Sequence, residues 1–470
     1  MADESLTRKS AGELAWLISS RAVSPLEVLD AHLAVIERVN PKLNAIVTLV
    51  ADRAREAARA AADAVLRSVP LGGLHGLPIG IKDITPTVGI RTTFGSPLFK
   101  DFVPNEDAEV VRRLKAAGAI VLAKTNTPEF AAGANTVNVL FGATRNPWNA
   151  ALSPAGSSGG SAVAVATGML PLAQGTDFGC SIRMPAAFCG IVGIRPTPGL
   201  TPNYPMPLAW DPGQVHGALG RTAEDVARML DAMVGFSRLS PISVAPPWAS
   251  ALAVVAASRD GKGLRLAYCS DIAGIGVDSE IDAVCRATAQ SLSDAGASVE
   301  EIDFDASEGR DPYQTWRGLW MVGQQFANLD RLEEFGANLK GNVKAGFKVR
   351  PLDYAAAEQR RAALFLKFRD LFERFDLLLI PASPIKPFPV EMNFPTEING
   401  KKLENYTDWI AGSFLITLMS LPAASVPAGK TRDGLPVGLQ IVGARFEEPR
   451  ILSLAKLIQQ MHPLGWPPET

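Results

Sequence analysis

The chain has 470 residues, of which 47% are hydrophobic and 20% charged, which indicates a folded protein with a large core rather than a disordered one. Its net charge is −2 and it has no long basic run, so nucleic acid or a membrane surface is not an expected partner. No apolar run reaches the roughly 18 to 20 residues of a transmembrane helix, and the first residues lack a secretory signal pattern. Four cysteines are too few for a disulfide framework, so we expect a cytoplasmic location.

The first 70 residues are predicted to form a layer of helices. Ser24 is followed by proline at the first helical position and by Glu27 at the capping-box position. Apolar residues then recur at helical spacing as far as Asn40, where the helix should end. The alanine- and arginine-rich stretch 51–66 predicts a second helix. Both helices are expected to cover the fold rather than to carry chemistry.

From residue 71 to residue 235, short apolar runs alternate with helical patterns. The runs predict strands and the patterns predict helices, in the chain order 78–81 (strand), 108–117 (helix), 119–123 (strand), 161–168 (helix), 190–194 (strand) and 222–234 (helix). This alternation indicates an α/β fold in which helices cover both faces of a sheet.

The second half of the chain repeats this organisation after a linker. Residues 236–263 are rich in Ser, Pro and Ala and predict the linker, and five prolines in 381–395 predict an irregular loop. The remaining patterns predict strands at 264–268, 298–302, 377–380 and 438–442 and helices at 281–295, 312–339, 354–375 and 409–419.

Two glycine- and serine-rich turns are the strongest candidates for chemistry. The first, 156–161, precedes an apolar run, and the second, 175–183, carries another serine between small residues. Serines in such turns can present hydroxyl groups beside unpaired backbone N–H groups, which are the components of a nucleophile and an oxyanion hole. Loops and phosphate-binding turns have a similar composition. The G-x-x-x-x-G-K-[ST] pattern of a nucleotide-binding loop is absent.

The same turns resemble the signature of the amidase signature family, G-G-S-S-G-G-S followed by G-T-D-x-G-G-S-I-R-x-P-A-x-x-C-G. The chain reads A-G-S-S-G-G-S at 155–161 and G-T-D-F-G-C-S-I-R-M-P-A-A-F-C-G at 175–190. Further matches lie, in the family's order, at 76–83, 123–126, 146–149 and 434–443. The resemblance implies one α/β/α domain over residues 1–470, built on a large mixed, mostly parallel central sheet covered by helices. In it, 71–235 is the signature core, 236–263 an excursion and 264–470 the second part of the same sheet domain.

The resemblance also identifies three candidate catalytic residues, Lys82, Ser157 and Ser181. Lys82 ends an apolar strand pattern, where loss of hydration lowers the pKa of a lysine and makes it a competent base. Ser157 is expected to follow a cis peptide bond from Gly156 and to relay a proton between Lys82 and Ser181. Ser181 would attack the substrate carbonyl and form an acyl-enzyme.

Other residues of the second turn are expected to support this chemistry. The resemblance implies that the backbone N–H groups of Phe178, Gly179, Cys180 and Ser181 form the oxyanion hole. We expect Asp177 and Arg183 to brace the turn as an ion pair. We also expect Ser158 and Asp83 to help hold the site in place without taking part in the reaction. Cys180 replaces a glycine of the family pattern, and we interpret it as a small packing residue rather than the nucleophile.

No metal or organic cofactor is expected. The chain has four histidines, none in a G-x-S-x-G or H-E-x-x-H setting, which argues against a Ser-His-Asp or zinc hydrolase. The resemblance to the amidase signature family implies hydrolysis of carboxylic amides, with a small-molecule amide and water as the partners. Esters and carbamates are further candidate substrates, and a homodimer is a possible assembly.

Several residues within and outside the signature favour a neutral, apolar or aryl amide, an aryl acylamidase-like preference. Leu152 stands where many relatives have a basic residue, and several aromatic and thioether side chains are candidates for the pocket wall, namely Phe178, Met184, Trp316, Trp320, Met321 and Phe388. Two alternatives stay open: the A subunit of a tRNA-dependent amidotransferase, and a non-enzymatic nucleotide- or ligand-binding protein.

Overall fold

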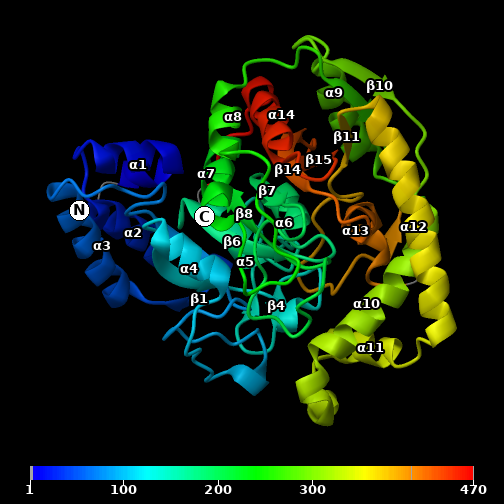
Figure 1. Ribbon diagram of the computed structural model, residues 1–470, viewed down its shortest axis with the longest axis horizontal. Coiled ribbons are helices and arrows are strands. Elements are labelled where there is room, and N and C mark those ends of the chain that lie inside the picture. Colours follow the sequence, from blue (N-terminus) through cyan, green and yellow to red (C-terminus); the bar gives the residue numbers. More distant parts are fainter. Residues whose placement is uncertain (1–3, 404, 469–470) are drawn as a thin grey trace.

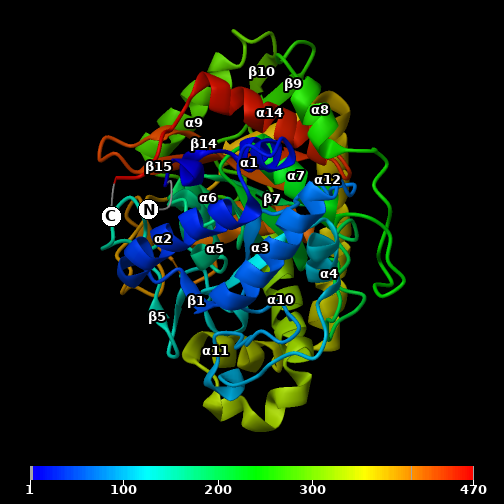
Figure 2. The same ribbon diagram turned by 90° about the vertical axis from the view of Figure 1, so that its left-hand side faces the viewer.

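The structure is a computed structural model that describes residues 4–403 and 405–468. In this part of the chain, eleven strands form one central sheet, with helices packed against it (Figures 1 and 2). Across the sheet the strands follow in the order β1 (Ile46–Leu49), β3 (Ile120–Thr125), β2 (Pro78–Lys82), β6 (Leu172–Asp177), β8 (Val215–Gly220), β7 (Val192–Arg195), β14 (Ala423–Lys430), β15 (Pro436–Gly443), β11 (Leu377–Pro381), β9 (Arg265–Tyr268) and β10 (Ser298–Glu301).

Fourteen α-helices occur among the described residues, together with short 3₁₀ helices and two small hairpins. The hairpins are β4–β5 (Val137–Asn138 and Gly142–Ala143) and β12–β13 (Glu397–Ile398 and Lys401–Lys402). The α-helices are α1 (Ala11–Ser19), α2 (Pro25–Leu43), α3 (Ala51–Leu66), α4 (Glu109–Ala116), α5 (Gly159–Ala166), α6 (Arg183–Cys189), α7 (Ala223–Met233), α8 (Ala251–Ala257), α9 (Ser279–Ser291), α10 (Arg310–Gln324), α11 (Ala337–Gly346), α12 (Pro351–Arg374), α13 (Ala411–Leu418) and α14 (Glu448–Met461).

The predicted α/β class, with a mixed sheet covered by helices, is confirmed. Parallel pairs occur in two groups, β3–β2–β6 and β11–β9–β10, and the strands between these groups pair antiparallel. Among the described strands of the sheet, four neighbouring pairs are parallel and six are antiparallel. The antiparallel share is high because β14 and β15 are joined by a short turn, which permits only antiparallel pairing.

Alternate residues of the central strands enter different parts of the core. Ala424 and Val426 of β14 pack in the same apolar cluster as Leu452 of α14, whereas Ala423 belongs to the cluster that contains Phe188 of α6. This period of two is expected for a strand that is buried on both faces. It explains why apolar residues occur on both faces of these strands.

Several predicted elements are confirmed with shifted boundaries. The capping box of α2 is present: the Ser24 hydroxyl accepts from the Glu27 N–H at 3.1 Å, and the Glu27 carboxylate accepts from the Ser24 N–H at 2.7 Å. The predicted helix 312–339 is divided into α10, a 3₁₀ helix (Phe326–Glu334) and α11. The predicted linker contains α8, which packs against α7 and α14.

Four strands of the central sheet and four helices, α1, α6, α8 and α14, were not predicted from the sequence. β1 lies within the expected helical layer, and it is four residues long and only partly buried, so its pattern is weak. β6, β8 and β14 contain Gly, Thr, Gln, His, Ser or Pro, which obscure the apolar signal of a strand. Helix α1 was likewise not predicted, although it has a complete capping box at Ser10.

The sheet brings the two signature turns to one edge. β2 and β6 are parallel neighbours, so Lys82 and Asp177 lie at the carboxyl ends of adjacent strands. Helix α5 begins two residues after Ser157 and approaches β3 closely: a Cβ atom on Gly160 would lie 2.3 Å from the backbone nitrogen of Asn126. Glycine is therefore required at this contact. None of the helices in the described residues has the length and apolar character needed to cross a bilayer.

Candidate active site

Lys82 is a fully buried lysine at the end of β2. Its Nζ donates to the Ser157 hydroxyl at 2.7 Å and to the Thr176 hydroxyl at 2.9 Å. Burial lowers the pKa of Lys82 to about 7, although Asp177 and Cys180 act in the opposite direction. Because the charged form is disfavoured, a large fraction of the lysine is neutral near pH 7 and can accept a proton.

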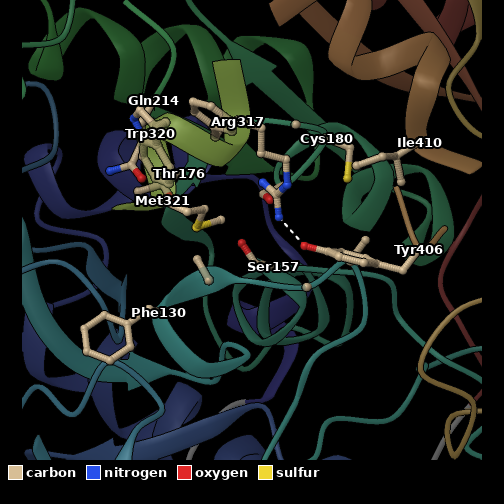
Figure 3. A pocket seen from close by; sticks show the side chains of 16 residues that line it. Phe130, Ser157, Thr176, Cys180, Gln214, Arg317, Trp320, Met321, Tyr406 and Ile410 are labelled. Carbon is tan, nitrogen blue, oxygen red and sulfur yellow. Dashed lines mark hydrogen bonds between the residues drawn. The ribbon is translucent and has the colours of Figure 1, made fainter. Parts of the chain in front are cut away.

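Ser157 joins Lys82 to the wall of a cavity. Its side chain is buried, the Gly156–Ser157 peptide bond is cis, and Ser157 lines the same cavity as Ser181 (Figure 3). The neighbouring Ser158 links the two signature turns, because its N–H donates to the Ser181 carbonyl at 3.0 Å and its hydroxyl donates to the Thr176 carbonyl at 3.2 Å. These two hydrogen bonds therefore fix the positions of the two signature turns relative to each other.

Ser181 lies in a five-residue turn, 178–182, between β6 and α6. The backbone N–H groups of Gly179, Cys180 and Ser181 donate to no acceptor within residues 4–403 and 405–468. These three residues and Phe178 also line the cavity. Successive unpaired N–H groups beside a hydroxyl can bind an oxygen atom that develops negative charge.

Cys180 is a buried residue that directly precedes Ser181 and lines the same cavity. Its thiol donates to the Gly156 carbonyl with a sulfur–oxygen distance of 3.6 Å. Burial raises the pKa of this thiol to about 12, and Asp177 adds to the increase. Since only a thiolate is strongly nucleophilic, Cys180 is poorly suited to attack a carbonyl carbon at neutral pH.

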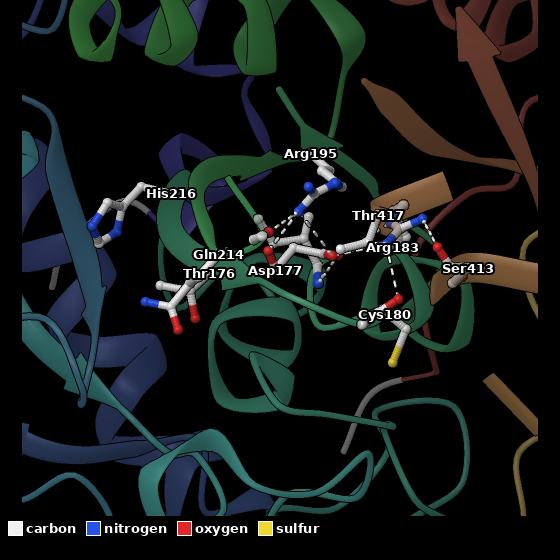
Figure 4. Close-up of polar contacts among 12 residues, drawn as sticks. Thr176, Asp177, Cys180, Arg183, Arg195, Gln214, His216, Ser413 and Thr417 are labelled. Carbon is white, nitrogen blue, oxygen red and sulfur yellow. Dashed lines mark hydrogen bonds and ion pairs between the residues drawn. The ribbon is translucent and has the colours of Figure 1, made fainter. Parts of the chain in front are cut away.

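A buried ion pair supports the turn that carries Ser181 (Figure 4). The Arg183 guanidinium bonds to both carboxylate oxygens of Asp177, at 2.8 and 3.2 Å, and both side chains are completely buried. Arg183 also donates to the Gly179 carbonyl at 2.9 Å, and the Asp177 carboxylate accepts from the Ile182 N–H at 2.9 Å. The pair thus closes the turn from both ends.

The electrostatics of this pair favour the charged forms. Burial by itself would raise the pKa of Asp177, but Arg183 and Arg195 outweigh it, and the pKa of Asp177 is lowered. The Arg195 guanidinium lies 3.7 Å from the same carboxylate and donates to the Asp177 and Gly213 carbonyls. Asp177 therefore stays ionised and acts as the counter-ion of two buried arginines.

Asp83 lies outside the cavity wall. Its carboxylate accepts from the N–H and hydroxyl groups of Thr93, at 3.2 and 2.5 Å, and burial raises its pKa. The nearby Lys124 donates to Thr85, Thr87 and Thr92. Asp83 therefore helps to hold the loop that follows Lys82, and it makes no hydrogen bond to Lys82, Ser157 or Ser181 within the described residues.

The cavity is narrow, with a volume of about 30 Å³, so a substrate can enter only when wall side chains move. The large apolar side chains of the wall are Phe130, Phe178, Trp320, Met321 and Ile410. The tryptophan of α10 stacks on Phe178 with ring centroids 4.2 Å apart, and Trp316 supports Phe178 from behind at 5.0 Å.

Three residues that we expected in the pocket wall, Met184, Trp316 and Phe388, do not line the cavity. Phe388 packs against Phe188 and Trp409 instead, and Met184 is buried within α6. Trp316 packs against Phe178. Leu152, which suggested a neutral substrate, pairs with Pro389 in an isolated bridge and also does not line the cavity.

Sequence reasoning missed several polar residues of the cavity wall. Thr176 is in the G-T-D segment beside the nucleophile turn, and that position was a usable signal. Gln214, Arg317 and Tyr406 come from three segments far from the signature and from one another. No sequence pattern relates them. Among the described residues, no three His, Cys, Asp or Glu side chains are grouped to hold a metal ion.

The fold and the cavity define an α/β enzyme with a buried lysine and two serines at one sheet edge. Its relatives agree with this class. The sequence pattern of the Amidase family matches residues 27–452. An acylamidase of Rhodococcus erythropolis is 34% identical over 473 residues, covering 98% of this chain and 97% of the relative. The A subunit of the glutamyl-tRNA(Gln) amidotransferase of Methylococcus capsulatus is 36% identical, with coverage of 96% and 97%.

Solved structures show the same relationship. A bacterial aryl acylamidase of the amidase signature family has a TM-score of 0.90 and 28% identity, with 96% of each chain covered. A 6-aminohexanoate cyclic dimer hydrolase has a TM-score of 0.85 and 26% identity, with coverage of 98% and 99%. The chain belongs to the Amidase family, the amidase signature enzymes. It is an enzyme that hydrolyses amide C–N bonds.

Replacing Asp177 with asparagine should lower the free energy of unfolding by about 3–5 kcal/mol, because the change leaves two buried arginines without a counter-ion. Since the pKa of Asp177 lies below its ordinary 3.8, the stabilisation is complete above that pH and is lost as the pH falls through the folded-state pKa. Denaturant unfolding at several pH values measures both effects.

The exposed pair Arg331–Glu334 provides a control. Glu334→Gln should leave the unfolding free energy nearly unchanged, since solvent screens this pair. Equal losses in the two variants would contradict the role assigned to Asp177.

Proposed function

We propose that the protein hydrolyses carboxylic amides through Ser181 as the nucleophile, with Ser157 and Lys82 as a proton relay. The observation that supports this proposal most directly is the 2.7 Å contact between the Lys82 amine and the Ser157 hydroxyl. Lys82 is fully buried and forms no ion pair with a carboxylate among the described residues. A solvated structural lysine would have neither property.

In the proposed first step, neutral Lys82 accepts the proton of Ser157, and Ser157 accepts the proton of Ser181. The Ser181 oxygen attacks the carbonyl carbon and forms a tetrahedral intermediate. The unpaired N–H groups of Gly179, Cys180 and Ser181 bind the negatively charged oxygen. When the C–N bond breaks, the relay returns the proton to the departing amine, which leaves an ester between Ser181 and the acyl group.

In the second step, water attacks the acyl-enzyme. The relay accepts a proton from this water, a second tetrahedral intermediate forms, and Ser181 leaves with the proton returned to its oxygen. Lys82 is neutral at the start and at the end of the cycle, so protons balance. Asp177 and Arg183 keep the oxyanion donors in place and take no part in proton transfer.

We propose an apolar or aryl amide as the substrate, with esters and carbamates accepted as well. The wall of Phe130, Phe178, Trp320 and Met321 supports an apolar group beside the scissile bond. The similarity to an acylamidase and to an aryl acylamidase points the same way. The similarity to amidotransferase A subunits supports a second candidate function, that of an amidotransferase subunit. Hydrolysis of glutamine distinguishes this function from that of an aryl amidase.

Ser181→Ala should reduce kcat by about 10⁴-fold or more, because it removes the proposed site of acyl attachment. Ser425→Ala is the matched control, since Ser425 is a buried serine of β14 away from the cavity and its hydroxyl has no hydrogen-bond partner. Mass spectrometry of wild-type protein during turnover should locate the acyl group on Ser181. An adduct on another residue would refute the assignment.

Activity should rise with pH through about 7, the pKa to which burial lowers Lys82. The base must be neutral to accept a proton, so kcat/KM increases as Lys82 loses its proton and then reaches a plateau. Lys82→Met should abolish this titration together with most of the activity. A rate that falls steadily from pH 5 to pH 8 would be inconsistent with a lysine base.

An acyl anilide should be hydrolysed with a kcat/KM about 100-fold or more above those of glutamine, asparagine and malonamide. The aromatic ring buries several carbon atoms against the wall, and each methylene equivalent contributes about 0.8 kcal/mol. Steady-state kinetics with purified protein give the comparison. A preference for the small polar amides would favour the amidotransferase-type alternative.

A further inference from the structure

Arg317 is a buried arginine in the wall of the catalytic cavity. It lies on α10, it is 7% exposed, and it lines the same cavity as Ser157 and Ser181. Figure 3 shows the guanidinium group extending from the helix towards the hydroxyl groups of Ser157 and Tyr406. A permanent positive charge therefore faces the place where the substrate must bind.

The hydrogen-bond partners of Arg317 are neutral. Its Nε donates to the Asn342 side-chain oxygen at 3.1 Å, and its Nη2 donates to the Tyr406 hydroxyl. Its Nη1 donates to no acceptor in the described part of the chain, and no described carboxylate forms an ion pair with the side chain. The other buried arginines near the turn differ, because Arg183 and Arg195 share Asp177.

A buried charge is normally paired, since burial removes its hydration and only an opposite charge compensates fully. A phenol and an amide compensate Arg317 only in part. Guanidinium is the donor best matched to a carboxylate, because two parallel N–H groups meet both oxygens. The cavity therefore offers a site for an anionic group, with Nη1 free and Nη2 held by a neutral acceptor that a carboxylate can replace.

Tyr406 adds a second donor to the same site. Its hydroxyl oxygen accepts from Arg317 and from the Asn342 amide, the latter at 2.6 Å. Its own proton is donated to no acceptor among the described residues. The hydroxyl is therefore available to a ligand oxygen in the cavity that both side chains line.

We propose that Arg317 is a specificity-determining residue that binds a carboxylate of the substrate. The preferred substrates are then amides that combine an apolar or aromatic body with a carboxylate. This inference rests on the proposed function, in which Ser181 attacks an amide in the same cavity. It replaces the expectation of a neutral substrate, which depended on Leu152, a residue that does not line the cavity.

The test compares pairs of amides in which a carboxylate is replaced by a neutral alkyl group. The acetamidobenzoate isomers carry a carboxylate on the amine side of the amide, and the matching acetotoluidides carry a methyl group at the same position. Succinanilic acid and valeranilide provide the same comparison on the acyl side. Wild-type protein should prefer the carboxylate in at least one series, by about 10- to 100-fold in kcat/KM, the range expected for a charge-assisted hydrogen-bonded pair.

Arg317→Met should reduce that ratio to about one, and Arg317→Lys should retain part of it. Arg360→Met is the matched control, because Arg360 is an exposed arginine of α12 that does not line this cavity. Its ratio should equal that of the wild type. Circular dichroism and the melting temperature show whether each variant is folded. If Arg317→Met does not fold, the carboxylate preference of Arg317→Lys tests the inference.

The inference is overturned if wild-type protein shows no carboxylate preference in either series, or if the preference survives in Arg317→Met. It is also overturned if Arg317→Met lowers kcat/KM equally for both members of each substrate pair, which would indicate a positioning role or contact with the oxyanion. The proposed function fails separately, and is recognised by Ser181→Ala retaining activity on the neutral anilides.

Discussion

The ion pair between Asp177 and Arg183 is the interaction on which the rest of the site depends. It closes the turn that carries Ser181, and the same guanidinium donates to the Ser413 carbonyl and the Gln440 side chain, both at 2.7 Å. These partners belong to α13 and β15, more than 200 residues further along the chain. A single buried arginine thus joins the signature turn to the second half of the sheet. Because all its partners lie in the interior, the geometry of the turn is determined by the whole core.

Lys82, Arg183 and Arg317 are buried cations near the two serines, and the protein compensates each in a different way. Lys82 has no counter-ion among the described residues, so burial lowers its pKa to about 7 and the neutral form becomes accessible. Arg183 cannot lose its proton and is paired with Asp177. Among the described residues, Arg317 has neutral hydrogen-bond partners and no ion-paired carboxylate, and it lines the cavity. These differences correspond to the three roles that we assign: base, structural support and substrate recognition.

Sequence reasoning was most successful where chemistry depends on a short contiguous segment. The two signature turns and the end of β2 were predicted to carry the candidate catalytic residues, and the structure places Lys82 and Ser157 in contact and Ser157 and Ser181 in one cavity wall. It was less successful for strands that contain polar residues, such as β6 and β8. It was also wrong about Met184 and Phe388 as wall residues, because their packing partners come from other segments.

By itself the sequence determined the fold class, the family resemblance and the positions of the candidate relay and nucleophile. These features depend on periodicity and on the order of residues within turns, which are local properties. Only the tertiary structure decided which side chains surround the cavity. Gln214, Arg317 and Tyr406 meet there because the sheet and α10 bring distant segments together, and no local pattern encodes such a meeting. The charge of the cavity was likewise decided by tertiary packing. Arg317 becomes a candidate binding group because packing buries it beside the cavity with no ion-paired carboxylate among the described residues.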